Sequence, residues 1–105
     1  MLFRSVVFTG FRNDVPDMLR LLDVVVHASI TPEPFGRVIA EAMAMKRPII
    51  ASSAGGPKEI IEDGRTGLLH PPGDVAALRR CLDRLATEPE TLAQQIGRAS
   101  CRERV

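Results

Sequence analysis

The chain has 105 residues, 45% of them hydrophobic and only 4% aromatic, and its 14 basic and 13 acidic side chains leave a net charge of +1 at pH 7. This length suits one small domain or a piece of a larger one, and the balanced charge gives no indication of nucleic acid or an acidic partner. No apolar run is long enough to cross a bilayer, the chain does not open with the residue order of a signal peptide, and the two cysteines lack metal or redox spacing. We therefore expect a cytoplasmic protein. From the balanced charge we expect that it binds no nucleic acid.

The first part of the chain alternates between strand-like and helix-like segments. Residues 5–9 (SVVFT) are short and β-branched, which predicts a buried strand. Asn13 and Asp14 are good N-cap residues for a helix over 15–22, where apolar side chains recur at helical spacing. Residues 24–28 (VVVHA) form the continuous apolar run that is typical of a strand in a parallel sheet.

The same alternation continues through the second part. The pattern predicts a helix over 38–45, a strand over 48–52, a turn of helix through 60–61 and a strand over 68–70. Asp74 would then cap a helix. Its expected core face consists of Val75, Leu78, Leu82 and Leu85. Thr87 and Pro89 are expected to start a further helix.

Strands and helices that alternate with short connections predict a parallel sheet flanked by helices, an α/β domain. We assign residues 1–95 to it. Residues 96–105 (IGRASCRERV) show no apolar periodicity. The codons ATC GGA AGA GCG TCG TGT AGG GAA AGA GTG, followed by TAG, encode this string and match a common sequencing-adapter read-through. We therefore interpret 96–105 as a non-native tail; the alternative is a basic, frayed C-terminus.

The stretch from Glu33 to Gly36 predicts an anion site. Glu33 lies between two prolines, which hold it in an extended or turn conformation just beyond the carboxyl end of a strand. Ligands bind at that edge of open α/β sheets. Gly36 permits close backbone approach as the next helix begins, and the amides of 37–39 would have no partner within the helix. Together with the helix dipole, these amides suit a phosphate.

Glu41 is the second carboxylate of this stretch. It follows Gly36 by five residues, so it lies about 7.5 Å further along the helix, a distance that matches the step from a diphosphate to a ribose. A carboxylate accepts hydrogen bonds from two adjacent hydroxyls well. The alternative is that Glu41 faces solvent and Glu33 lies in an ordinary acidic loop.

The string EPFGRVIAEAMA, with Glu33 and Glu41 as an E-x7-E pair, resembles the donor-site signature of retaining GT-B glycosyltransferases, above all the large "group 1" family. Supporting motifs follow the same order, VVFTGF before it and RPIIASSAGGPKEIIEDGRTGLL after it. The resemblance runs from residue 6 to about residue 92. It implies a truncated Rossmann-like sheet, the second domain of a GT-B fold.

The resemblance also implies residue roles. Glu33 would be the catalytic-site residue that hydrogen-bonds the donor sugar. Sugar and diphosphate would be held by backbone amides, those of Phe35, Gly36, Arg37 and Val38. Glu41 would bind the ribose, while Phe11 and Arg12 would lie near the base. No cofactor is implied beyond the nucleotide-sugar donor. Since the sequence has no Asp-x-Asp and no His/Cys cluster, we expect no metal and interpret His27 and His70 as structural.

Some parts of the family pattern have no counterpart in this sequence. The acceptor-binding first domain and the opening βα unit of the second are absent, so we expect one unpaired sheet edge and no catalysis by this chain alone. In the full-length enzyme the missing N-terminal domain would bind the acceptor, and peripheral membrane association is possible. Two other functions stay open: a GT-B nucleotide-sugar epimerase, and a non-catalytic Rossmann-like nucleotide-binding module. The donor sugar, its base and the acceptor are not specified.

Overall fold

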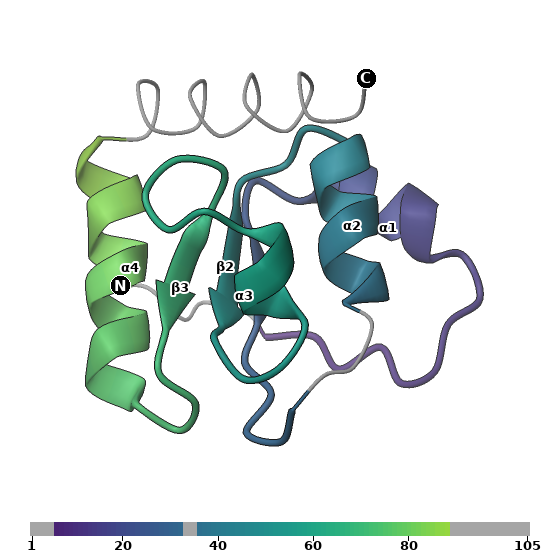
Figure 1. Cartoon of the computed structure of the whole chain (residues 1–105). Helices are drawn as coiled ribbons and strands as arrows, with labels where there is room; N and C mark the ends of the chain where they lie inside the picture. The colour runs from purple at the N-terminus through teal and green to yellow at the C-terminus, as the bar shows by residue number, and fades with distance from the viewer. Residues whose placement is uncertain (1–5, 33–35, 89–105) are drawn as a thin grey trace.

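The computed structural model describes residues 6–32 and 36–88, which form a parallel sheet with helices on both faces (Figure 1). This is the α/β architecture that the alternating segments predict. Along the chain the elements are α1 (Val15–Leu21), β1 (Val25–His27), α2 (Arg37–Ala44), β2 (Ile49–Ser52), α3 (Pro57–Ile60), β3 (Leu68–His70) and α4 (Val75–Thr87). None of the helices in these two ranges is long and apolar enough to cross a membrane.

The sheet has the strand order β1-β2-β3, with both pairs parallel. Val25 lies beside Ile49 and Ile50 beside Leu68, and all four residues of β2 are buried. Because parallel strands end at the same edge, the segments that follow them gather there. α2 comes after β1 and α4 after β3, so both helices begin at this carboxyl edge, at the lower end of the sheet in Figure 1.

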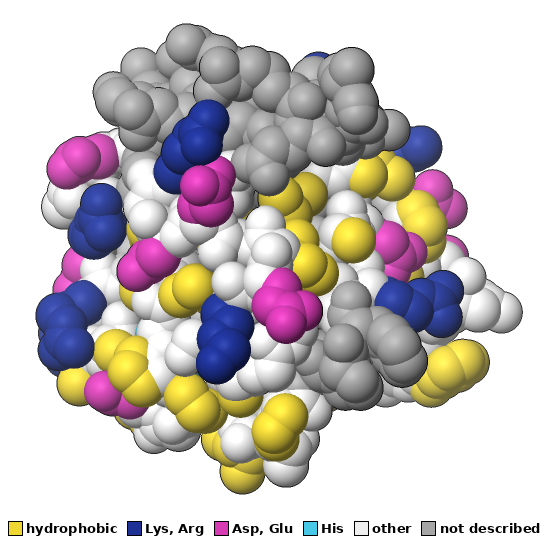
Figure 2. All heavy atoms as spheres, in the orientation of Figure 1, with side chains coloured by type: hydrophobic (Ala, Val, Ile, Leu, Met, Phe, Trp, Pro, Cys, Tyr) yellow, Lys and Arg dark blue, Asp and Glu magenta, His cyan; other side chains and the backbone are white. Residues whose placement is uncertain are grey.

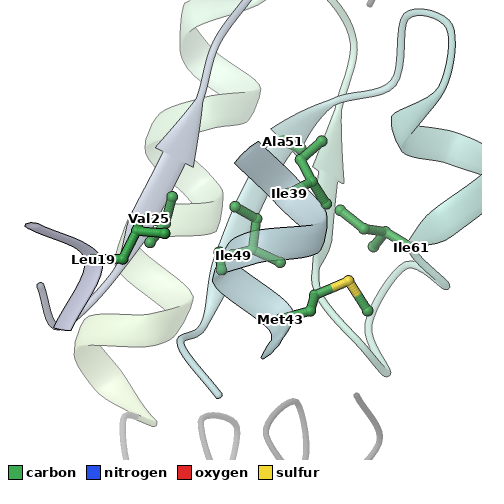
Figure 3. Close-up of a cluster of buried hydrophobic side chains, with 8 residues drawn as sticks. Leu19, Val25, Ile39, Met43, Ile49, Ala51 and Ile61 are labelled. Carbon is green, nitrogen blue, oxygen red and sulfur yellow. The ribbon is translucent and has the colours of Figure 1, made fainter. Parts of the chain in front are cut away.

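Two hydrophobic clusters cover the two faces of the sheet. One joins α1, α2 and the residue after α3 to β1 and β2, and its buried members are Leu19, Val25, Ile39, Ala42, Met43, Ile49, Ala51 and Ile61 (Figure 3). The other places α4 against β2 and β3, through Ile50, Leu68, Cys81 and Leu85. Alternate residues of β2 point to opposite faces, as strand geometry requires. The continuous apolar runs are therefore explained by burial on both sides.

The predicted strands over 24–28, 48–52 and 68–70 are confirmed as β1, β2 and β3. The predicted helices over 15–22 and 38–45 are confirmed as α1 and α2, with boundaries that differ by one residue. The turn of helix expected through 60–61 occurs as α3, slightly earlier in the chain. Apolar runs and helical spacing were sufficient signals for these elements.

The strand predicted over 5–9 is wrong for its described residues, 6–9, which lie outside the sheet. Val6, Val7 and Phe8 are exposed, Phe8 at 93%. A strand forms only where a neighbour supplies the ladder of hydrogen bonds. The described ranges offer this segment no such neighbour, so β propensity alone does not order it as a strand.

The predicted core face of α4 is only half right. Leu85 is buried and Leu78 half-buried, but Val75 is 78% exposed and Leu82 42% exposed. The buried stripe instead follows Ala77, Cys81 and Leu85 at a spacing of four residues. Among the described residues, α4 therefore packs on β2 and β3 through this stripe, which is rotated around the helix from the predicted face.

The helix predicted to start at Thr87 is also corrected, because Thr87 is the last residue of α4. Its hydroxyl donates to the carbonyl of Asp83 one turn earlier, at 3.0 Å. This is the bond of a hydroxyl within a helix, not of an N-cap residue. Pro89 and the tail assigned to 96–105 lie outside the described residues, so the interpretation of the tail stays a prediction.

Candidate functional site

The start of α2 is an open helix N-terminus at the carboxyl edge of the sheet. Its N-cap residue, Gly36, is in the left-handed conformation with φ 61° and provides no capping side chain. The first amide with a partner inside the helix is that of Ala40, which donates to the Gly36 carbonyl at 3.0 Å. The amides of 37–39 therefore precede the hydrogen-bonded ladder, as predicted, and concentrate partial positive charge there.

Glu41 lies one turn further along α2, half-buried at the side of the helix. Its carboxylate makes no hydrogen bond or ion pair with any residue in the two described ranges, although Arg37 is four positions away on the same helix. The buried stripe of α2 consists of Ile39, Ala42 and Met43. Glu41 thus borders this stripe instead of joining it, and its acceptor oxygens are left for another group.

The other predicted residues of this stretch fall into two groups. Arg37 and Val38, the first two residues of α2, have exposed side chains. Glu33 and Phe35 lie outside the described residues, and their predicted roles stay predictions. On the face drawn in Figure 2, basic and acidic side chains are interspersed.

Phe11 and Arg12, predicted near a base, lie in the segment 6–14, which crosses the lower part of Figure 1. Phe11 is 95% exposed, so nothing holds its ring against α2. Arg12 donates two hydrogen bonds to Asp14, at 2.7 and 2.6 Å. This pairing raises the pKa of Arg12 and lowers the pKa of Asp14. The structure does not bring these two residues together with Glu41.

The start of α4 is the second helix N-terminus at this edge. As predicted, Asp74 is its N-cap, and its carboxylate accepts from the amide of Ala77 at 2.9 Å. Beside it is a mostly apolar cavity of about 140 Å³, lined by Ala28, Ile30, His70, Gly73, Asp74, Val75 and Leu78. His70 is buried, with Nδ1 3.0 Å from the carbonyl of Pro71, which fits the structural role predicted for it. No pattern in the sequence predicts this cavity.

Within residues 6–32 and 36–88, no three His, Cys, Asp or Glu side chains come together in a group that could hold a metal ion. Cys81 is buried against the Leu69 carbonyl, and burial raises the pKa of its thiol. A buried, protonated thiol is a packing residue and not a nucleophile.

Solved structures identify the class of this fold as the GT-B glycosyltransferases. The Anabaena protein Alr3699/HepE, solved in complex with UDP-glucose, superposes with a TM-score of 0.84 at 36% identity, over 96% of this chain and 29% of that one. The C-terminal domain of the Glycosyl Transferase Group 1 Family Protein LpcC from Francisella tularensis gives a TM-score of 0.75 at 36% identity, over 90% of this chain and 48% of that one.

The family model described as "Glycosyl transferases group 1" matches residues 2–88, and the chain belongs to that family. Among curated relatives, the alpha-D-kanosaminyltransferase of Streptomyces kanamyceticus is 38% identical over 87 residues. That match covers 81% of this chain but only 22% of the relative. The resemblance inferred from the E-x7-E stretch is confirmed, and the chain corresponds to the C-terminal domain of its GT-B relatives.

Proposed function

We propose that this chain is the donor-binding part of a glycosyltransferase that moves a sugar from a nucleoside-diphosphate sugar to an acceptor. The observation that carries the proposal is the start of α2, where amides that no described side chain caps lie about one turn from the Glu41 carboxylate, which pairs with no residue in 6–32 or 36–88. The proposal is supported by family membership and by the UDP-glucose complex of Alr3699/HepE. The chain matches less than a third of either full-length protein, so the activity of the whole protein belongs to this proposal.

The residue roles follow from the order of groups along α2. The diphosphate would accept hydrogen bonds from the amides of 35–38, where the dipole of the helix favours negative charge. Glu41 would accept from the two ribose hydroxyls, about 7.5 Å further along. Glu33, ahead of the helix, would bind hydroxyls of the donor sugar. Phe11 and Arg12 would reach the base only after the segment 6–14 moves, since Phe11 is now exposed and Arg12 is paired.

The chemistry would be transfer with retention of anomeric configuration and without a metal ion or cofactor. As the bond from sugar to diphosphate breaks, the sugar takes on oxocarbenium character and negative charge builds on the leaving diphosphate. Amides already aimed at that position stabilise the charge without reorganisation. The acceptor would bind to a different domain of a longer, cytoplasmic polypeptide, which would associate peripherally with a membrane when its acceptor is a lipid.

Titration of the 105-residue chain with UDP, GDP, ADP and UDP-glucose, followed by calorimetry, tests the proposal. Glu41→Gln should lower affinity for the preferred free nucleotide about tenfold, because a neutral amide replaces the ribose acceptor. Glu33→Gln should leave free nucleotide affinity unchanged and weaken only the nucleotide sugar.

The matched control is Glu59→Gln, which neutralises an exposed carboxylate on α3. If Glu41→Gln and Glu59→Gln weaken nucleotide binding equally, Glu41 has no specific role. If none of the four ligands binds the wild-type chain, the proposal fails for this chain.

A further inference from the structure

The space into which a side chain at the left-handed Gly36 would project is occupied by a residue from a different helix. A Cβ atom built on Gly36 would lie only 2.9 Å from Cδ1 of Ile60, and 3.8 Å from Cδ1 of Ile39. Ile60 is the last residue of α3 and is half-buried against the cluster of α1, α2 and β2. Its terminal methyl therefore occupies the space beside residue 36 that any other side chain would need.

The end of α3 is itself fixed to the sheet. Ile61 is buried, and its amide donates to the Pro57 carbonyl at 2.9 Å. A Cβ on Gly67 would lie 3.0 Å from Cγ2 of Ile61, so the backbone at Gly67 packs tightly against the Ile61 side chain. The buried Thr66 accepts from the amide of Glu62 at 2.8 Å. Ile60 thus projects from a well-packed segment, and its half-buried side chain places Cδ1 beside Gly36.

We propose that Ile60 is a positioning residue for nucleotide binding, which holds Gly36 in its left-handed conformation and so aims the amides of 37–39. The inference rests on the proposed function, since it concerns the same helix start. Glycine has no Cβ, so the backbone at residue 36 can adopt a wider range of φ and ψ angles than any other residue type would allow. Contact with Ile60 restricts that freedom before the ligand arrives, which lowers the entropic cost of binding.

Two small substitutions test this contact in the 105-residue chain. Ile60→Val removes only Cδ1, the atom that faces Gly36, and should lower UDP affinity about tenfold. Gly36→Ala adds the Cβ that collides with this atom and should lower both the melting temperature and UDP affinity. In the double variant, Ile60→Val should partly restore both quantities, because the atom that the new Cβ meets is gone. The effect of Ile60→Val thus changes sign between the two backgrounds.

Ile61→Val is the matched control, because it removes the same methyl from the adjacent residue, which contacts Gly67 and not Gly36. It should lower the melting temperature at least as much as Ile60→Val but leave UDP affinity within about twofold. Equal losses of UDP affinity in the two valine variants, or an effect of Ile60→Val with the same sign in both backgrounds, would overturn the positioning role alone. Absence of nucleotide binding by the wild-type chain would overturn the proposed function with it.

Discussion

The helices α2 and α4 both begin at the carboxyl edge of the sheet, but their first turns are completed differently. Asp74 caps α4 with its own carboxylate, which accepts from the amide of Ala77. Gly36 begins α2 without a capping side chain. One amide in the first turn of α4 is therefore satisfied by the helix's own cap, whereas no described side chain caps the first turn of α2. The start of α4 is thus a structural helix start, and the start of α2, on the same edge of the sheet, is the candidate binding site.

The two starts also differ in what stabilises them. In α2 the first turn contains Ile39, which is fully buried between the helix and the sheet. In α4 the first residue, Val75, is exposed, and the cap at Asp74 provides the local stabilisation. We therefore expect packing to fix the start of α2, and hydrogen bonding to fix the start of α4.

The largest expected effect comes from Ile39→Ala. Removing a fully buried side chain of this size costs about 2–5 kcal/mol in the free energy of unfolding, because transfer and cavity terms add. The neighbouring Val38→Ala should cost less than about 1 kcal/mol, since Val38 is exposed at the helix surface. Urea denaturation monitored by circular dichroism measures both. Equal losses would mean that packing does not fix the first turn of α2.

Asp74→Ala should have an intermediate effect, a loss of about 1 kcal/mol in the free energy of unfolding, because the amide of Ala77 loses its acceptor. UDP affinity should be unchanged, since α4 begins on the other face of the sheet. Asp83→Ala, which removes an exposed carboxylate from the same helix, is the control and should be nearly neutral. If Asp74→Ala weakens nucleotide binding, the distinction between the two helix starts is wrong.

The smallest effect concerns the other end of α2. Lys46 has φ 58°, and its amide and that of Arg47 donate back to Met43 and Ala42, the hydrogen bonds of a Schellman ending. Glycine is favoured there, so Lys46→Gly should stabilise the chain by about 0.5–1 kcal/mol. Lys46→Ala keeps the Cβ and should give no such gain. An increase in melting temperature with glycine but not alanine would show that the left-handed conformation of Lys46 costs stability at the C-terminal end of α2.

The sequence predicted most of the fold because its signals are local. Continuous apolar runs identified the strands, and helical spacing identified α1 and α2. The segment 6–9 was mispredicted because a strand depends on its neighbour as much as on its own residues. The exposure of Val75 and Leu82 was missed because helical periodicity does not decide which apolar stripe of α4 packs on the sheet.

The candidate site was predictable to the same extent. The spacing of Gly36 and Glu41 along one helix is a local property, and the structure places both as expected. The contact between Gly36 and Ile60 was not predictable, because it joins two helices that are separated along the chain by β2.

The position of β2 between two parallel neighbours has a kinetic consequence. Its backbone is hydrogen-bonded on both sides and all its side chains are buried, while within the described residues β1 and β3 each pair on one side only. Opening of β2 requires that both helical layers separate, so its amides should be the last to exchange with deuterated solvent. β1 and β3, each paired on one side only among the described residues, can fray without it. Ile39, Ala42 and Met43 of α2 lie in the same cluster as Ile49 and Ala51 of β2, so the helix that carries the candidate site is tied to the strand that opens last.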